Sequence, residues 1–205
     1  MARLSQSDRD RVLAAIAEAE RRTSAEFAVA VAGSADAYAE LRLAIPALLA
    51  VLLPPLLFAF DLARHPLWLA AVPAIAFVAA SAVLLPDAVA VRLVPERRRI
   101  SRAVRLAQAL FVELGLAAPR ERAGVLLFVA RAERQIDILT GPGVAERVDP
   151  SAWQEVVRGF VAAARHQPLP EALIGAIEAS TALLSRAFPP SEHNPDEVAN
   201  RLIEL

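Results

Sequence analysis

The sequence predicts an α/β fold, arranged as a three-layer α/β/α sandwich, with an inserted two-helix transmembrane hairpin. Two long apolar runs, residues 43–60 and 66–86, interrupt a chain that is otherwise patterned like a globular domain. On both sides of these runs, segments with helical periodicity alternate with short β-branched segments, which is typical of α/β proteins. We therefore expect residues 1–42 and 87–205 to form one domain and residues 43–86 to form the hairpin.

The first apolar run contains eighteen residues without a charge, eleven of them Leu, Ile, Val or Phe. A hydrocarbon core roughly 30 Å thick needs about 20 helical residues, and about 17 suffice. At about −0.3 to −0.6 kcal/mol for each of the eleven, insertion gains roughly −3 to −7 kcal/mol. Two buried core helices are the alternative, but a soluble helix of this length has a polar face, which neither run shows. The prolines leave open whether the runs span the bilayer or re-enter it: Pro46, Pro54, Pro55 and Pro73.

The connection between the runs, residues 61–65, has room only for a tight turn, so the chain enters and leaves the membrane on one side. Arg42 precedes the first run and the connection contains only Arg64, whereas six arginines follow the second run: Arg92, Arg97, Arg98, Arg99, Arg102 and Arg105. The positive-inside rule then predicts a multi-pass protein of the inner membrane with both termini in the cytoplasm.

The six arginines after the second run have two compatible interpretations. They fix the orientation of the hairpin, and they can also bind anionic lipid headgroups, each contact contributing about 1 kcal/mol near the surface. The expected partners are the lipid bilayer and other membrane proteins. A formal net charge of −1 gives no electrostatic footprint for nucleic acid. The absence of cysteine excludes a disulfide framework, a thiolate nucleophile and a cysteine-ligated metal.

Before the apolar runs, the pattern predicts a helix capped by Ser5 or Ser7 and then a strand at residues 27–31. The helix has an apolar stripe formed by Val12, Leu13, Ile16 and Ala19. In the strand, Phe27, Val29 and Val31 point to one face, and the other face carries alanines small enough for a helix to pack closely: Ala28, Ala30 and Ala32.

After the second run, the sequence predicts one long helix over residues 87–114, ended by Gly115. Its expected apolar side is Ile100, Val104, Ala107, Phe111 and Leu114. A buried strand at residues 124–129, a polar turn at 131–134 and a second strand at 135–140 then form a hairpin that ends in a glycine turn. Asp149 and Pro150 open a helix whose apolar stripe contains Trp153, Val156, Val157, Phe160, Val161 and Ala164. A last packed helix follows at 170–188, and we expect a short helix at 195–205.

Three segments of this order resemble the TPM domain, the family that includes a thylakoid-lumen acid phosphatase and photosystem II repair proteins. Residues 20–29, ERRTSAEFAV, resemble its entry into the first strand. Residues 121–129, ERAGVLLFV, resemble its second strand, and residues 135–144, QIDILTGPGV, resemble its third strand and glycine turn. The resemblance implies a bacterial membrane protein of this family, in which the hairpin interrupts the domain directly after the first strand.

The relatives imply two functions: a non-catalytic membrane-anchored module for the assembly or quality control of membrane proteins, and a divalent-metal-dependent acid phosphatase that would use Ca²⁺ or Mg²⁺. A metal-assisted phosphoryl site needs convergent carboxylates. The candidates are Glu26, Asp137 and Asp149, and each has a structural role available, such as pairing with an arginine, facing outward from a strand, or capping a helix. We therefore expect the non-catalytic module, without a cofactor.

Overall fold

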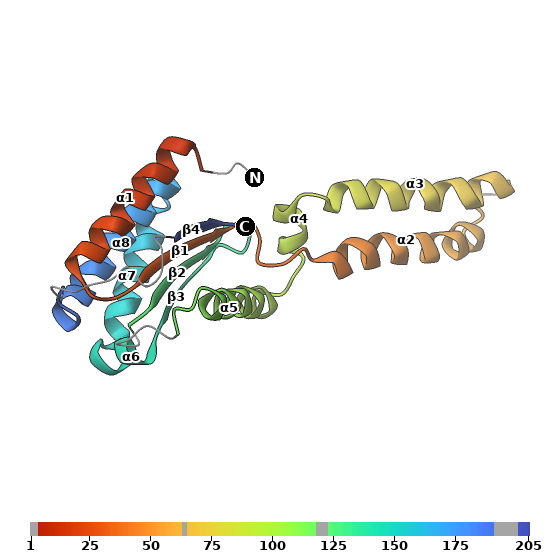
Figure 1. Cartoon of the computed structure of the whole chain (residues 1–205). Coiled ribbons are helices and arrows are strands. Elements are labelled where there is room, and N and C mark those ends of the chain that lie inside the picture. Colours follow the sequence, from red (N-terminus) through yellow and green to blue (C-terminus); the bar gives the residue numbers. More distant parts are fainter. Residues whose placement is uncertain (1–3, 63–64, 118–122, 191–200) are drawn as a thin grey trace. The chain divides into compact units, whose positions relative to one another are not determined.

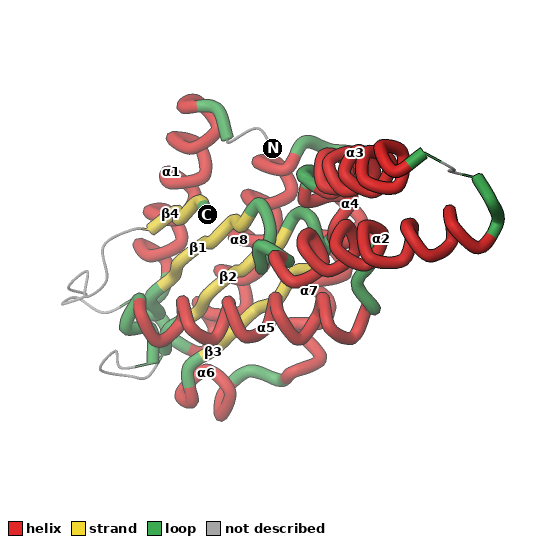
Figure 2. Tube along the Cα trace, turned by 90° about the vertical axis from the view of Figure 1, so that its right-hand side faces the viewer, coloured by secondary structure: helices red, strands yellow, loops and turns green. Residues whose placement is uncertain are grey.

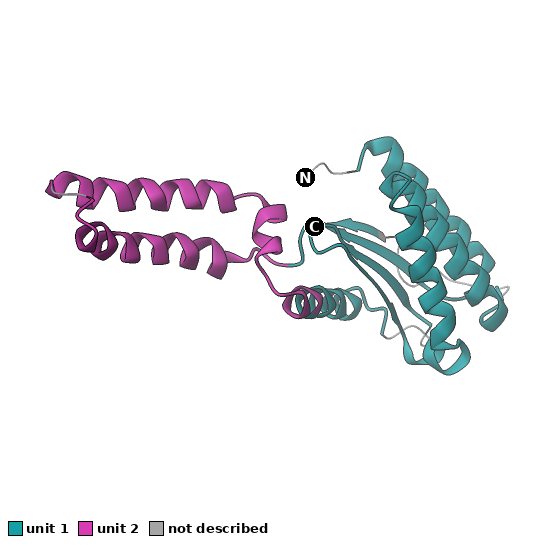
Figure 3. Ribbon diagram, turned by 180° about the vertical axis from the view of Figure 1, so that it is seen from behind, with its two compact units in different colours: residues 1–35, 101–205 teal, residues 36–100 magenta. Residues whose placement is uncertain are grey.

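The computed structural model describes residues 4–62, 65–117, 123–190 and 201–205. The chain divides into two compact units, residues 1–35 with 101–205 and residues 36–100 (Figure 3). Arg64, the Glu121-Arg122 pair of the second motif and the first residues of the helix expected at 195–205 lie outside the described residues.

The first unit contains a four-stranded sheet with the strand order β3-β2-β1-β4 (Figure 1). The central strand β1 (Phe27–Ala32) is parallel to β2 (Val125–Ala130) on one side and to β4 (Arg201–Glu204) on the other, and β2 is antiparallel to β3 (Gln135–Thr140). The strand before the apolar runs therefore pairs with a strand after them, in a register that joins Phe27 to Val125 and Ala32 to Ala130.

Helices cover both faces of this sheet, which confirms the predicted α/β/α class. Figure 2 shows α5 (Glu96–Glu113) crossing one face. Residues of α1, α6, α7 and α8 form the core on the other face, and these helices span Gln6–Arg22, Pro142–Arg147, Pro150–Ala163 and Leu169–Ala187. Ser5 caps α1 by accepting a hydrogen bond from the backbone N–H of Asp8, so one of the two expected caps is confirmed.

The predicted alternation along β1 is also confirmed. Phe27, Val29 and Val31 belong to the core under α1, α7 and α8. The alanines at 28, 30 and 32 belong to a second core with Ala103 and Ala107 of α5, and all five of these alanines are fully buried. Small side chains on both surfaces let the helix approach the sheet closely, because no bulky group separates the two backbones.

The single helix expected at residues 87–114 is wrong. The chain forms α4 (Asp87–Arg92) and then α5, and Pro95 lies between them. The proline ring disfavours the helical conformation of the residue before it, so the helix stops and a new one begins. The predicted stop is confirmed, since Gly115 has a φ of +74° just after α5.

The apolar side of α5 is rotated by about one residue from the expected one. Its buried residues are Ala103, Ala107 and Leu110. Ile100 is 38% exposed, and Val104 and Phe111 are only half-buried. The close approach to the alanine face explains the difference, because it selects the smallest side chains for the centre of the contact and leaves the larger ones at its sides.

The C-terminal segment also differs from the expectation, since residues 201–204 form strand β4 instead of a helix. Leu205 extends the pairing of β4 with β1: its N–H donates to the carbonyl of Val31, and its carbonyl accepts from the N–H of Gly33 at 2.7 Å. Two smaller differences occur nearby. The glycine turn after β3 continues into α6. In α7, Trp153, Val156 and Phe160 are buried, but Val157, Val161 and the C-cap residue Ala164 are not.

The second unit contains α2 (Ala39–Ala59) and α3 (Pro66–Leu84), which run antiparallel to each other (Figure 1), followed by α4. Both helices continue through their internal prolines. Each is long and apolar enough to cross a membrane. The fold class is therefore α/β with an inserted two-helix apolar hairpin.

Candidate functional site

The most unusual surface of the chain is the apolar surface of α2 and α3. Val51 and Phe58 of α2 are 70% and 76% exposed, and Ile75 of α3 is 64% exposed. Only 6% of the most apolar stretch of α2 and 11% of that of α3 are buried. Core helices of a soluble domain are mostly buried, so two buried core helices do not fit these exposures.

An ion pair closes the base of this hairpin. Arg42, in the first turns of α2, donates from Nη2 to Oδ1 of Asp87, the first residue of α4. Both side chains are partly exposed, at 26% and 38%. Arg42 is one of the positive residues expected to orient the hairpin. The carboxylate of Asp87 offsets much of the positive charge of Arg42. The positive charge next to the hairpin therefore comes mainly from the arginines after it.

Those arginines are concentrated on one helix. Arg92 is the last residue of α4, and the other five lie in α5: Arg97, Arg98, Arg99, Arg102 and Arg105. Their spacing places Arg98, Arg102 and Arg105 on one side of α5, because residues four and three apart lie one above the other. Arg97, Arg98 and Arg105 are exposed, and they form no salt bridge with any described residue. Their charge is thus available to an anionic surface.

The three candidate carboxylates lie on separate elements. Glu26 directly precedes β1, Asp137 is in the middle of β3, and Asp149 precedes α7. Glu26 is 7% exposed, and its carbonyl accepts from the N–H of Val125 at 2.8 Å. Within the described part of the chain, no group of three or more His, Asp or Glu side chains has the arrangement needed to hold a metal ion.

Asp149 acts as the N-cap of α7. Its Oδ1 accepts a hydrogen bond from the N–H of Ser151 at 2.7 Å. The side chain of Ser151 and this backbone hydrogen bond lower the pKa of the Asp149 carboxyl, because both favour the charged form. The cap therefore contributes stability above the ordinary aspartate pKa, and this contribution is lost as the pH falls through the lowered value. Capping accounts for this residue without a ligand role.

Asp137 lies in β3 opposite Phe128, on the face of the sheet that α5 covers. Gln135 donates from Nε2 to Oδ1 at 3.3 Å, and Oδ2 is buried without a hydrogen-bond partner among the described residues. Burial raises the pKa of the Asp137 carboxyl, and the hydrogen bond from Gln135 opposes this only partly. The charged form therefore destabilises the fold at neutral pH.

We expect Asp137→Val to raise the melting temperature at pH 7, since it removes a half-buried charge from a strand. The gain should shrink as the pH falls, because the wild-type carboxyl takes up a proton first in the folded state and loses its penalty. Thermal unfolding of both proteins between pH 7 and pH 4 tests this. A metal-ligand role predicts the opposite pattern, in which Mg²⁺ or Ca²⁺ stabilises the wild type and Asp137→Val loses that stabilisation.

One buried acid was not found among the sequence candidates. Glu133 is 7% exposed, and its Oε1 accepts from the hydroxyl of Ser34 and from the N–H of Ala35, both at 3.0 Å. It ties the turn between β2 and β3 to the segment after β1. The sequence shows it only as part of a polar turn, because its partners lie 98 and 99 positions away.

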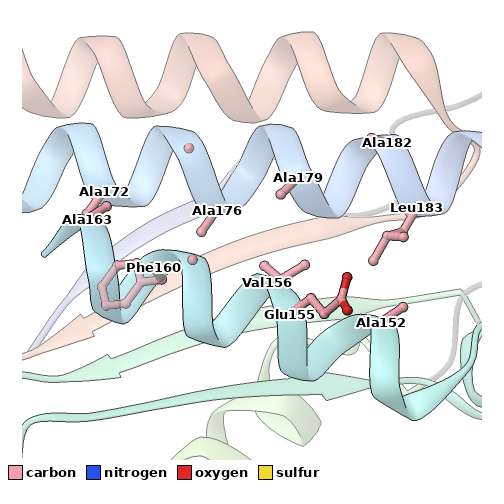
Figure 4. A pocket seen from close by; sticks show the side chains of 12 residues that line it. Ala152, Glu155, Val156, Phe160, Ala163, Ala172, Ala176, Ala179, Ala182 and Leu183 are labelled. Atoms are coloured by element: carbon pink, nitrogen blue, oxygen red, sulfur yellow. The ribbon is translucent and has the colours of Figure 1, made fainter.

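A shallow groove of about 480 Å³ separates α7 from α8. Figure 4 shows Val156 and Phe160 of α7 opposite Ala176 and Ala179 of α8. Glu155 is the one charged side chain in its lining. The other lining residues are apolar or glycine, so the groove is mainly an apolar surface.

Residues 88–183 match the family model of the TPM domain. This match begins in α4 and ends in α8. The NMR structure of the BA42 protein from the psychrophilic bacterium Bizionia argentinensis is similar in fold, with a TM-score of 0.63 and 15% sequence identity over 100% of this chain and 97% of BA42. No curated protein matches the chain significantly. Residues 88–183 are therefore similar to the TPM domain, and two of the three motifs, residues 121–129 and 135–144, lie within this match. The chain carries a two-helix apolar hairpin between the first and second strands of its sheet.

Proposed function

We propose that the hairpin anchors the TPM domain in a bacterial inner membrane, where the domain acts as a non-catalytic module in the assembly or quality control of other membrane proteins. The observation that supports this most is the exposure of apolar side chains along α2 and α3. In water such a surface would favour aggregation, whereas in a bilayer it is solvated by lipid.

The arginines of α5 support a cytoplasmic location for the domain. Arg97 and Arg98 are exposed close to the chain position where the hairpin ends. Contacts of these guanidinium groups with anionic headgroups would each add about 1 kcal/mol to membrane binding. The expected arrangement has both termini in the cytoplasm and residues 61–65 on the outer side.

Crosslinking in native membranes tests the docking role. We expect the full chain to crosslink to integral membrane proteins, because docking requires both partners in one bilayer. The matched control is the full chain with Val51→Arg and Ile75→Arg, which keeps the domain surface but weakens the anchor. The proposed role would be contradicted if the wild-type chain and the double variant both crosslinked to soluble proteins, and in equal yield.

A metal-dependent phosphatase is the second candidate, favoured by the phosphatase-like members of the TPM family. Hydrolysis with Ca²⁺ or Mg²⁺ needs oxygen ligands that converge on the ion and on the developing charge. Glu26, Asp137 and Asp149 are distributed over three elements, and Asp149 is engaged as a helix cap. This distribution favours the non-catalytic module.

We expect the purified full chain to hydrolyse an aryl phosphate no faster than the buffer, with or without Mg²⁺ or Ca²⁺. The assay should include Glu26→Ala and Asp149→Ala, and Arg158→Ala serves as a surface control. Hydrolysis that depends on the metal and disappears in Glu26→Ala or Asp149→Ala, at an unchanged melting temperature, would establish the phosphatase instead.

A further inference from the structure

A second cavity lies in the first unit, where the turn between β2 and β3 meets the end of α7 and the start of α8. Its volume is about 640 Å³. Val129 and Ile136 of the strands line it together with Phe160 of α7 and Leu169 of α8. This is the size range of small-molecule sites, and the wall is apolar as in most of them.

The polar part of the lining is strongly basic. It contains Arg131, Arg134 and Arg165 and no carboxylate. Arg134 and Arg165 are exposed, and neither forms a salt bridge with a described residue. Glu133, the acid of the same turn, does not line the cavity, since its Oε1 accepts from Ser34 and Ala35 instead.

The backbone of the turn between β2 and β3 defines the positions from which Arg131 and Arg134 project. Arg134 adopts a left-handed conformation with a φ of +55°, and its N–H donates to the carbonyl of Arg131 at 3.3 Å. The C-terminal end of α7 and the N-terminal end of α8 both adjoin the cavity, and their opposite half-charges largely cancel. The charged groups of the lining are therefore all positive, and Arg134 and Arg165 are the two that form no salt bridge with a described residue.

We infer that this cavity binds a small anionic amphiphile from solution, with a phosphate or carboxylate headgroup on a short hydrocarbon chain. Arg134 and Arg165 bind the headgroup, because a guanidinium donates two parallel hydrogen bonds to either anion. The hydrocarbon chain packs against Phe160 and Leu169. This site lies outside the hairpin and the arginines of α5, so it goes beyond the anchoring role and does not depend on it.

Isothermal titration of the full chain in phosphatidylcholine nanodiscs with octyl phosphate tests this site, and titration of empty nanodiscs corrects for partitioning. We expect saturable binding that Arg134→Ala with Arg165→Ala weakens by about tenfold or more, since each lost guanidinium removes charge-assisted hydrogen bonds. The matched control, Arg158→Ala with Arg186→Ala, removes the same charge from exposed positions of α7 and α8 outside the lining, and its affinity should stay close to that of the wild type.

Ligand variants separate the remaining alternatives. Octanoate should bind, butyl phosphate should bind more weakly than octyl phosphate, and octyltrimethylammonium should not bind. Equal affinity for inorganic phosphate and octyl phosphate would overturn the amphiphile assignment in favour of a plain anion site. Binding of a nanodisc phosphatidic acid without binding of octyl phosphate would also overturn it, because the ligand would then be a bilayer headgroup. An unchanged affinity in the Arg134 and Arg165 double variant would show that the ligand binds elsewhere.

Discussion

Replacing Val51 and Ile75 by arginine is expected to release the protein from the membrane. Both residues lie near the middle of their helices and are 70% and 64% exposed. An arginine at the centre of a membrane-spanning helix costs about 2.5 to 3.5 kcal/mol, and the lost apolar residue adds about 0.3 to 0.6 kcal/mol. Each substitution thus removes about 3 to 4 kcal/mol, which is comparable to the insertion free energy of roughly 3 to 7 kcal/mol for the first run and roughly 3 to 5 kcal/mol for the second.

Carbonate washing of membranes that contain the full chain measures this effect. Wild-type protein should stay in the membrane pellet, and a large share of the double variant should move to the supernatant. Val112→Arg is the matched control, because Val112 is 69% exposed on α5 outside the hairpin, and this variant should stay in the pellet. A double variant retained as firmly as the wild type would contradict membrane insertion of α2 and α3.

Gly124→Ala, directly before β2, should strongly destabilise the domain. A Cβ atom at this position would lie 2.1 Å from the carbonyl oxygen of Leu116 and 2.8 Å from its carbonyl carbon. Both are backbone atoms, so the clash cannot be relieved by rotating a side chain. The carbonyl of Gly124 also accepts from the N–H of Gly141 at 2.7 Å, which restrains it further. We expect a loss of about 3 kcal/mol or more of unfolding free energy.

Gly159→Ala is the control for this substitution. Gly159 lies in α7, and a Cβ atom there would meet nothing within 4 Å. Alanine at a helical position without a clash should stabilise the domain by about 0.5 to 1 kcal/mol. Denaturant unfolding followed by the fluorescence of Trp153, in a Trp68→Phe background, measures both variants. Equal stabilities of the two variants would show that the Gly124 contact does not constrain the fold.

The features that could be predicted from the sequence are those fixed by local pattern. The alternation of large and small residues in β1 predicted both faces of the central strand, including the close packing of a helix on its alanines. The apolar runs predicted the two helices of the hairpin, since length and composition decide them. The boundaries of β3 follow from its flanking turns, and Asp149 signals the start of α7.

The features that the sequence did not reveal depend on distant contacts. Strand β4 has only four residues, too few for a periodic signal, and its pairing joins Ala28 to Arg201 across the whole domain. The sequence does contain Pro95 at the break between α4 and α5. The helical pattern on both sides of this proline nevertheless favoured one continuous helix. The side of α5 that faces the sheet was predicted only in part: Ala107 and Leu114 are buried as expected, whereas Ile100 is exposed.

The candidate site shows the same division. The arginines were placed together because they occupy one helix, and helical spacing is a local property. The cavity with Arg134 and Arg165 joins a turn to the end of α7, and no periodicity links these positions. Glu133 likewise gains its role from Ser34 and Ala35, which the fold brings to the turn.

Cysteine labelling tests the central claim most directly. The claim is that an inserted hairpin anchors the domain, and that the segments before and after the hairpin both lie on the cytoplasmic side. The chain contains no cysteine, so a single introduced one reports its own position. Leu62, in the connection between α2 and α3, is 72% exposed, and Gln108 is exposed on α5. In intact bacterial cells a membrane-impermeant maleimide should label the Leu62→Cys protein but label the Gln108→Cys protein only after lysis. Labelling of Gln108→Cys in intact cells, or protection of Leu62→Cys until lysis, would contradict it.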